Sequence, residues 1–401
     1  MANVSSSNGL EKRPKLRFPG FDEPYKQCRI GDIYAERSQR GASDMELLSV
    51  TMNDGVMPRS AIEGKDNSSE DKSNYKVVLT GDMVYNSMRM WQGANGISPC
   101  DGIVSPAYTV LMPKIPISNG YFAALFKSPN LINEFRKNSQ GMTSDTWNLK
   151  YPQIETIKVI IPTLSEQERI ADMLGILEKR ITKQAQLVDS LKKYKRGVVH
   201  ELLSPEKCKL PGVTWTSSKI GDLGNFTKGA PLSKADISPD GTPFILYGEL
   251  YTTYNEVITS IVRKTNAKVD EIYYSRIGDV IIPTSGETPE EISTASCVMQ
   301  KGVILAGDLN IFRGNMLDGR IISYILNHIV NAEIARVAQG KSVVHVQANE
   351  ISKIEISYPD ADAQKKMIYI FEAIAEKIFY AEKQLKSLND LRSGLLQQLF
   401  I

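Results

Sequence analysis

The chain has 401 residues, of which 42% are hydrophobic and 23% charged, and its formal net charge is +2. This length exceeds one ordinary hydrophobic core, so we expect at least two domains of a soluble globular protein. No run of about eighteen apolar residues is present and the N-terminus is polar, so neither a membrane span nor a secretion signal is predicted. The four cysteines lack CxxC spacing, which predicts free thiols in a reducing cytoplasm.

The first segment, residues 1–160, predicts a mixed α+β domain. Strand-like stretches at residues 75–79 and 107–111 are separated by turn-rich segments, and a helical stretch lies near residues 120–137. A glycine-containing loop at residues 140–144 follows that helix. Aromatic, amide, basic and hydroxyl side chains gather in two loops of this segment. They suit base edges and phosphates, although packing and turn formation are the commoner use of each one. The candidates are Tyr85, Asn86, Arg89, Trp91, Gln92, Thr143 and Ser144.

A long helix is predicted over residues 161–203. A short strand at residues 157–161 ends at Pro162, and Ser165 with Glu168 forms the pattern of a capping box. A helix of about 38 residues is roughly 57 Å long at about 1.5 Å per residue. Apolar residues recur at heptad spacing, as in a coiled coil. The predicted interface residues are Leu174, Leu177, Ile181, Val188 and Leu191.

Residues 179–196 of this helix carry the sharpest local excess of positive charge. Seven Lys and Arg residues face one acid, Asp189. A solvated helix face is the favoured interpretation, and a surface for nucleic-acid phosphates is the alternative.

Residues 204–358 predict a second mixed domain. Strand-like stretches occur at residues 244–247 and 279–282, and a helical stretch near residues 319–338 leads to a second glycine loop. The corresponding candidates for contacts to bases and phosphates are Tyr247, Glu249, Tyr251, Thr252, Lys341, Ser342 and His345.

The two halves are copies of one unit. An offset of 197 aligns residues 154–203 with residues 351–400 without a gap, and it pairs Pro162 with Pro359 and Gln167 with Gln364. Residues 359–401 therefore predict a second long helix, with Asp362 at the cap position. Its interface residues are Phe371, Ile374, Ile378, Leu385 and Leu388.

The duplicated layout predicts the fold class. Two tandem mixed α/β domains are separated by two long helices, which zip into an antiparallel coiled coil with a pseudo-twofold internal repeat. Lys195 and Arg392 occupy the same heptad position in the two helices. Such polar residues fix the register of a coiled coil or mark a place where it frays, and both interpretations stay open.

Motifs for catalysis are missing from the sequence. It contains no G-x-x-x-x-G-K-[ST] phosphate loop, no G-x-G-x-x-G fingerprint and no Asn/Asp-Pro-Pro-aromatic tetrapeptide. The histidines have no metal-ligand spacing. Pro359-Asp360 with Lys365 and Lys366 faintly resembles a nuclease motif, but helix capping explains Asp360 better. We therefore predict no catalytic residue, no metal site and no cofactor in this chain.

The chain resembles the specificity subunits of type I restriction-modification systems. Residues 16–21 with 30–32 resemble the start of that family, residues 161–171 its proline-to-helix junction, and residues 395–400 its C-terminus. The resemblance covers nearly the whole chain. The second junction, residues 358–364, departs from it by lacking the Glu-Gln-Glu-Arg sequence.

The resemblance implies a non-catalytic, cytoplasmic subunit of a host-defence complex. In it, two target recognition domains each read half of a split, asymmetric site in double-stranded DNA. The long helices set the gap and bind two methyltransferase subunits, and restriction-translocase subunits complete the complex. S-adenosylmethionine, ATP and Mg are then expected on the partners. The runner-up is a coiled-coil scaffold for proteins, without sequence preference in DNA binding. A self-sufficient methyltransferase or nuclease is the third possibility, which activity of the purified chain would support.

Overall fold

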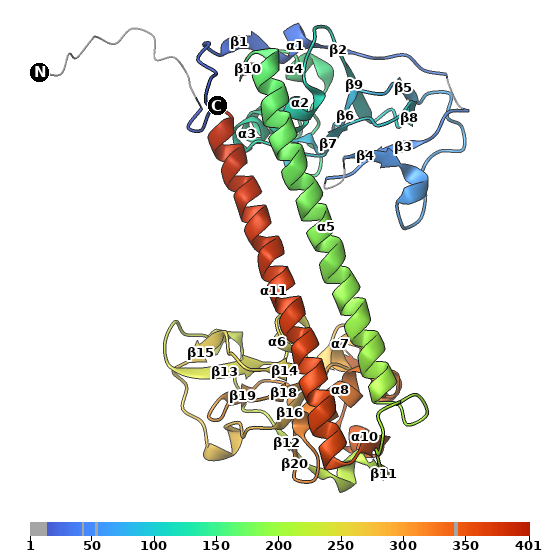
Figure 1. Cartoon of the computed structure of the whole chain (residues 1–401), viewed down its shortest axis with the longest axis vertical. Coiled ribbons are helices and arrows are strands. Elements are labelled where there is room, and N and C mark those ends of the chain that lie inside the picture. The colour runs from blue at the N-terminus through green and yellow to red at the C-terminus, as the bar shows by residue number, and fades with distance from the viewer. Residues whose placement is uncertain (1–13, 42–43, 53–54, 341–343) are drawn as a thin grey trace, which may run out of the picture. The chain divides into compact units, whose positions relative to one another are not determined.

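The computed structural model describes residues 14–41, 44–52, 55–340 and 344–401. The chain divides into two compact units. The first unit comprises residues 1–185 and 383–401, and the second comprises residues 186–382. Each unit contains one globular domain and a part of each long helix, α5 (Leu164–Leu202) and α11 (Ala361–Leu399), as Figure 1 shows. The structure thus consists of two mixed α/β domains joined to long helices.

The domain of the first unit is built on an antiparallel sheet in the order β2-β9-β6-β7. The strand pairs β3-β4 and β5-β8 form two separate two-stranded sheets. The strands are β2 (Tyr34–Glu36), β3 (Leu48–Val50), β4 (Val56–Pro58), β5 (Lys76–Val78), β6 (Met83–Asn86), β7 (Asn95–Ile97), β8 (Gly102–Val104) and β9 (Tyr108–Pro113).

The helical stretch expected at residues 120–137 consists of two helices, α2 (Asn119–Leu125) and α3 (Pro129–Asn138). The prediction of a single helix is wrong here because Pro129 lacks the backbone N–H that an uninterrupted helix needs at this position. Pro129 instead opens α3, and the Ser128 hydroxyl caps it by accepting a hydrogen bond from the Leu131 amide. The corresponding stretch of the second unit also divides, into α8 (Gly319–His328) and α9 (Asn331–Val337).

The first domain closes on itself before the long helix begins. Its first strand, β1 (Lys26–Arg29), pairs antiparallel with its last strand, β10 (Lys158–Ile161). The short helices α1 (Ile30–Ile33) and α4 (Tyr151–Ile154) lie beside this pair. A Cβ on Gly31 would approach the Cβ of Glu155 to 3.0 Å, which accounts for the glycine in Ile30-Gly31-Asp32.

The domain of the second unit repeats this plan with additions. Its main sheet has the order β12-β20-β16-β18-β14, and smaller sheets are formed by β15-β13-β19 and β17-β21. The strands are β12 (Gly224–Lys228), β13 (Thr242–Leu246), β14 (Val257–Ile258), β15 (Arg263–Thr265), β16 (Asp279–Pro283), β17 (Ser285–Gly286), β18 (Ser296–Val298), β19 (Ile304–Ala306), β20 (Leu309–Gly314) and β21 (Val344–His345). Strand β11 (Trp215–Lys219) pairs with β22 (Glu355–Pro359), as β1 does with β10. The helices include α6 (Glu249–Thr252), α7 (Pro289–Ile292) and α10 (Ala348–Ser352).

Each of the two Gly-Asp motifs at the 197-residue offset pairs a buried aspartate with an arginine, which lies just after β2 in the first domain and in β20 in the second. Asp82 accepts hydrogen bonds from the Leu79 amide and from Nε of Arg37, at 2.9 and 2.6 Å. Asp279 accepts from the Arg276 amide at 2.9 Å and from Nε of Arg313 at 3.2 Å. Each aspartate therefore ends a turn and fixes a neighbouring strand, which is more than the turn alone that the motif suggested.

A buried glutamine joins each domain to its long helix. The Gln167 amide nitrogen donates to the Pro162 carbonyl at 3.0 Å, and its oxygen accepts from the Ser118 amide at 3.1 Å. Gln364 makes the same two contacts, to Pro359 and to the Asp318 amide, at 2.8 and 3.1 Å. This equivalence in three dimensions explains why the two positions align in the sequence.

The caps of the long helices differ from those predicted. Helix α5 begins at Leu164, so Ser165 lies inside its first turn and is not the cap. Helix α11 begins at Ala361, and Asp360 caps it by accepting hydrogen bonds from the Asp362 and Ala363 amides, each at 3.1 Å. Asp362 is therefore not the cap, because it lies two residues too late. The expectation that capping explains Asp360 is confirmed.

Opposite ends of the long helices meet in each unit. In the first unit, Ile170 and Leu174 near the start of α5 share a hydrophobic core with Leu399 at the end of α11. In the second unit, Val199 near the end of α5 shares a core with Phe371 near the start of α11. The two helix segments therefore run antiparallel within each unit. Of the predicted interface residues, the buried ones are Leu174, Leu177, Ile181, Val188, Phe371, Ile374 and Ile378, and the half-buried ones are Leu191, Leu385 and Leu388.

Candidate nucleic-acid interface

Two loops of the first domain, predicted separately as contact regions, lie side by side. Short helix η2 (Met90–Gln92) carries Trp91, whose ring packs edge-on against Trp147 of the second loop with 5.1 Å between centroids. The Leu149 amide also donates to the Ser87 carbonyl at 2.9 Å. Residues 86–92 and 140–148 therefore form one surface, which we call the first loop surface.

The loop at residues 140–148 is tightly braced. Gly141 has a φ of +148°, and a Cβ there would lie 2.6 Å from the Thr146 carbonyl oxygen, so a glycine is required. The Thr146 hydroxyl donates to the Thr143 carbonyl at 2.9 Å, and Gln140 pairs with Asn148. This bracing leaves the side chains of Met142, Thr143 and Ser144 exposed.

Several side chains on this surface have the chemistry for reading DNA. Arg89 and Gln92 are exposed, and their side chains suit guanine and adenine edges respectively. Trp91 is half-buried, with its indole N–H donating to the Met88 carbonyl at 3.1 Å. The Arg136 guanidinium lies over the Trp147 ring, 5.4 Å from its centroid. The surface thus combines aromatic, amide and basic groups on a braced frame.

Two residues of this domain that are predicted to contact DNA, Tyr85 and Asn86, are not fully exposed. Tyr85 is fully buried in the core beside Met83, and burial raises the pKa of its hydroxyl. Its assignment as a DNA contact is therefore wrong, because strand β6 is buried along most of its length. Asn86 is half-buried, and its side-chain oxygen accepts a hydrogen bond from the Met88 amide at 3.0 Å, which shapes the turn.

In the second domain, the structure divides the predicted group on α6. Glu249 is buried, accepts a hydrogen bond from the Leu246 amide at 3.2 Å and pairs with Nε of Arg263 at 2.8 Å. Its proposed DNA contact is therefore wrong, because both carboxylate oxygens are used within the fold. Tyr247 and Tyr251 are half-buried, and Thr252 is exposed. Burial, followed by the nearby hydroxyl of Tyr247 and two carboxylates, raises the pKa of Tyr251.

His345 is exposed on β21, where it pairs with Ser285 of β17 and with Gln339. This Gln339–His345 pairing corresponds to the Gln140–Asn148 pairing of the first domain. Lys341 and Ser342, also predicted here, lie outside the described residues.

The candidates drawn from the sequence did not include residues 284–293, which follow β16 as residues 87–94 follow β6. The 197-residue offset of the Gly-Asp motifs pointed to them. Together with β21 they make the second loop surface, on which Glu287 and Thr288 are exposed. The carboxylates of Glu291 and Glu287 contribute to the raised pKa of Tyr251, which places α6 next to this segment.

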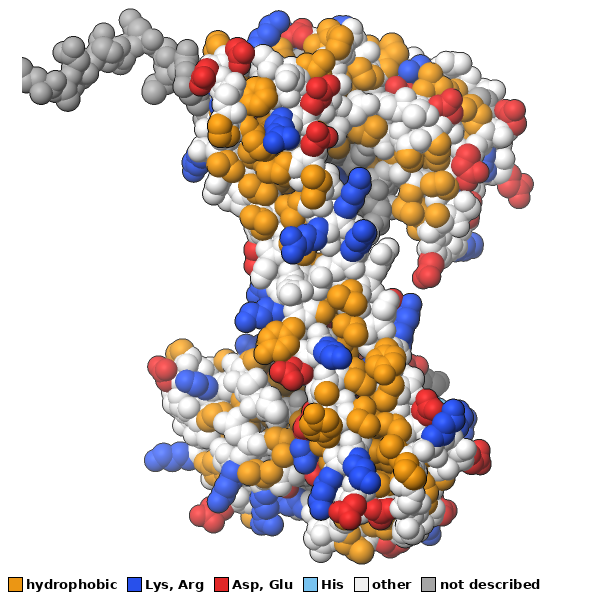
Figure 2. Space-filling view, in the orientation of Figure 1, with side chains coloured by type: hydrophobic (Ala, Val, Ile, Leu, Met, Phe, Trp, Pro, Cys, Tyr) orange, Lys and Arg blue, Asp and Glu red, His pale blue; other side chains and the backbone are white. Residues whose placement is uncertain are grey.

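The long helices expose apolar side chains beside basic ones, visible in Figure 2 as orange next to blue. The exposed apolar residues are Ile176, Leu187 and Tyr194 of α5 and Tyr369, Phe379, Tyr380 and Leu391 of α11. Three lysines of the basic segment are paired, Lys192 with Glu382, Lys193 with Asp189 and Lys195 with Glu256. Three of the seven positive charges of that segment are thus neutralised locally.

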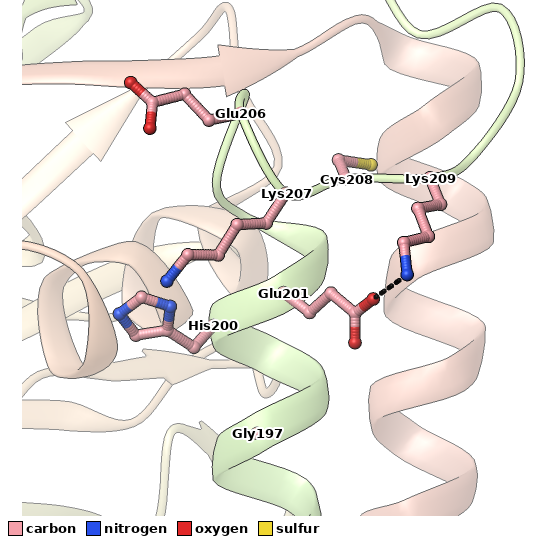
Figure 3. Close-up of a pocket in the computed structure, with 7 residues that line it drawn as sticks. All are labelled: Gly197, His200, Glu201, Glu206, Lys207, Cys208 and Lys209. Carbon is pink, nitrogen blue, oxygen red and sulfur yellow. Dashed lines mark ion pairs between the residues drawn. The ribbon is translucent and has the colours of Figure 1, made fainter.

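A surface hollow of about 510 Å³ lies at the C-terminal end of α5. Figure 3 shows His200 and Lys207 on one side of it and Glu201 with Lys209 on the other, the last two joined by a 3.8 Å ion pair. The side chains do not converge on one point. Among the described residues, no group of three or more His, Cys, Asp or Glu side chains could hold a metal, and no helix is long and apolar enough to cross a membrane. The four cysteines are free thiols.

Comparison with known proteins identifies the family. The model of the type I restriction modification DNA specificity domain matches residues 23–193 and again residues 212–389. The chain belongs to this family. The two matches correspond to the duplicated halves, so the chain carries two DNA specificity domains.

Relatives of this specificity protein match it along most of their length. The MjaIX type I restriction enzyme specificity subunit of Methanocaldococcus jannaschii is 20% identical over 387 residues, covering 92% of this chain and 82% of the relative. The crystal structure of the type I restriction-modification S subunit from M. genitalium superposes with a TM-score of 0.61 at 15% identity, covering 97% and 99% of the two chains. A structure from work on complex assembly and conformational transition of the type I R-M system superposes with a TM-score of 0.58 at 14% sequence identity. This match covers 96% of this chain and 99% of the other. These structures share the fold of this chain.

Proposed function

We propose that this chain reads a bipartite, asymmetric DNA site as the specificity subunit of a type I restriction-modification complex. The observation that carries the proposal is the duplication itself. The four-stranded sheet order of the first domain recurs in the second, which adds β14 at one edge, and both domains have the same helix junction but different loops at equivalent positions. A shared frame with divergent loops is suited to reading two different half-sites.

We assign to each domain the residues that contact one half-site. In the first domain we propose that Arg89, Trp91, Gln92, Thr143 and Ser144 contact DNA, with Asn86 shaping their loop. In the second domain we retain Tyr247, Tyr251, Thr252 and His345 and add the segment 284–293. Lys341 and Ser342 stay predictions. Arginine and amide side chains supply base contacts, and hydroxyl groups supply phosphate contacts.

The long helices are proposed to form an antiparallel coiled coil that sets the gap between half-sites. Buried apolar residues recur along both helices, which supports this role. Their exposed aromatic and aliphatic residues, such as Tyr369 and Tyr380, are the proposed docking sites for two methyltransferase subunits, because large exposed apolar side chains mark interaction surfaces. Restriction subunits would join this assembly.

Catalysis is assigned to the partners. Methylation with S-adenosylmethionine, and ATP- and Mg-dependent cleavage, would then occur on subunits other than this non-catalytic, cytoplasmic chain. In this proposal the acidic, aromatic and hydroxyl groups of the two loop surfaces recognise DNA sequence. A protein-binding scaffold would instead show no preference among DNA sequences.

The proposal is tested by methylome sequencing of cells that express this chain with its methyltransferase, against cells with the methyltransferase alone. A split asymmetric motif that requires this chain is the expected result. If an active methyltransferase yields no such motif, the scaffold alternative replaces the proposal.

The role of the helices has its own test. Inserting one heptad into both α5 and α11 adds about 10 Å of helix, at about 1.5 Å per residue. The preferred gap in the methylated motif should then lengthen by about 3 base pairs, from the 3.4 Å rise of DNA. A motif with its original gap would contradict the spacer role.

A further inference from the structure

A buried charge cluster attaches the second domain to helix α5. Lys195 of α5 places Nζ 2.6 Å from Oε2 of Glu256, and His328 at the end of α8 places Nε2 2.7 Å from Oε1. The exposed fractions of the three side chains are only 11%, 12% and 16%. Both oxygens of one carboxylate are thus used, one toward the helix and one toward the domain.

The Glu256 carboxylate stays charged despite its burial. Burial alone would raise its pKa, but the hydrogen bonds from His328 and Lys195 and the positive charge of Lys195 outweigh this effect and hold the pKa at about 2. The backbone of Glu256 is also fixed, because its carbonyl accepts hydrogen bonds from the Cys297 amide at 2.8 Å and from the Ser323 hydroxyl. The carboxylate therefore has one defined position.

Tyr324 connects this cluster to the second long helix. Lys195 Nζ lies 5.4 Å from the centroid of the Tyr324 ring, which stacks on His328 at 6.2 Å and packs on Phe371 of α11 at 4.6 Å. The cluster thus contacts α5, α8 and α11 at one point. Apolar contacts alone tolerate small rotations, whereas short charged hydrogen bonds are directional.

The first domain has no counterpart of this cluster among the described residues. Arg392, which aligns with Lys195, instead approaches Glu178 of α5 at 3.4 Å, and both side chains are exposed by more than a third. Glu256 immediately precedes β14, the additional edge strand of the second domain's sheet. Glu256 therefore lies beside a strand that the main sheet of the first domain, as far as the structure describes it, does not have, whereas Lys195 and His328 come from α5 and α8.

We propose that Lys195, Glu256 and His328 form an orientation lock that fixes the second domain on the helix pair, so that its half-site is read at one spacing only. Lys195 and Glu256 are then positioning residues, which act through the domain and do not contact DNA. The inference rests on the proposed function. It assigns the choice of spacing partly to this lock and not to helix length alone.

The first test uses the full chain with its methyltransferase and DNA in which the gap is shortened or lengthened by one base pair. Lys195→Met keeps the length of the side chain but removes its charge. The preference of the Lys195→Met complex for methylating DNA with the correct gap should fall on the order of tenfold. Misplacing reacting groups by about 1 Å can lower a reaction rate by up to about 100-fold. The base preferences within each half-site should be retained. Lys195→Arg, which keeps the charge, should restore the gap preference.

Lys192→Met is the matched control, because Lys192 lies on the same helix and forms an exposed ion pair with Glu382. It should leave the gap preference unchanged.

A second readout does not depend on DNA. Spin labels on non-natural residues at Ser190 of α5 and Ser260 of the domain should show a broader distance distribution in Lys195→Met.

The outcomes are separable. No split motif with the unmodified chain would overturn the proposed function. A split motif together with an unchanged gap preference and distance distribution in Lys195→Met would overturn the lock. If Lys195→Met fails to fold, His328→Gln, which alters only one of the two contacts, should broaden the same distribution, and an unchanged distribution would equally refute the lock.

Discussion

The two units attach a similar domain to a similar helix with different charged groups. In the first unit, Glu166 in the first turn of α5 is fully buried and accepts hydrogen bonds from Nε and Nη2 of Arg17, at 2.9 and 2.8 Å, and from the Tyr25 hydroxyl at 2.9 Å. In the second unit, the aligned residue is Ala363, and the buried charge is Glu256. The charged attachment thus involves the N-terminal segment in one unit and a residue beside an additional edge strand in the other.

This difference explains the divergence of the second junction. The Glu-Gln-Glu-Arg sequence includes Glu166, whose partner Arg17 lies in the N-terminal segment. The second copy loses that glutamate but retains the glutamine, because Gln364 still joins Pro359 to the Asp318 amide. Residues that build the common frame are retained, and residues that attach a particular segment are not.

The largest expected effect comes from breaking the attachment of the first unit. Arg17→Met leaves Glu166 as an unpaired buried charge, which should cost about 3–5 kcal/mol of stability. Urea denaturation, with hydrogen exchange to localise the change, should show the loss in the first unit. Lys15→Met, an exposed change two residues earlier, is the control. Equal destabilisation by both variants would contradict a specific role for the Arg17–Glu166 pair.

The second unit should show a distinct pH dependence. The pKa of Glu256 is lowered from 4.5 to about 2. The contribution of its charged carboxylate to folding stability is therefore complete above pH 4.5 and is lost as the pH falls through about 2. The shift corresponds to roughly 3 kcal/mol. The difference in unfolding free energy between the unmodified chain and Glu256→Gln should shrink over that interval. A difference independent of pH between 5 and 2 would show that the charge of Glu256 is not what matters.

The common frame should respond equally in the two units. Gln167→Leu and Gln364→Leu each leave a proline carbonyl and a backbone amide without their partner, and each should cost about 1–3 kcal/mol. Unfolding followed by hydrogen exchange should report a loss in the first unit for one variant and in the second unit for the other. A large effect in only one unit would argue against equivalent junctions.

The smallest expected effect separates the observed helix cap from the predicted one. Asp360→Ala should destabilise the start of α11 by about 1 kcal/mol, because Asp360 accepts from two helix amides. Asp362→Ala should change thermal stability little. The reverse order would restore Asp362 as the cap.

The sequence was most informative where local chemistry and repetition agree. The strand, proline and helix at residues 157–202 follow from apolar periodicity, and the offset of 197 carried the same interpretation to residues 354–399. The family resemblance, drawn from residues 16–21 with 30–32, 161–171 and 395–400, is confirmed by the match over both halves.

Burial limited the prediction of site residues. Tyr85 and Glu249 have side chains suited to DNA contacts, but one lies in a buried strand and the other pairs with Arg263. The burial of Tyr85 and the Arg263 partner of Glu249 depend on the folded domain, so no local pattern separated these two residues from the exposed Arg89 and Gln92. The lock residues Lys195, Glu256 and His328 are likewise far apart in the chain and meet only in the folded domain.

The most direct test of independent half-site reading is methylome sequencing of single-domain variants. Trp91→Ala with Gln92→Ala should make only one half of the split motif degenerate, and His345→Ala with Thr252→Ala only the other half. The account predicts that each pair leaves the opposite half and the gap unchanged. Degeneration of both halves by one pair, or of neither half by both pairs, would contradict it.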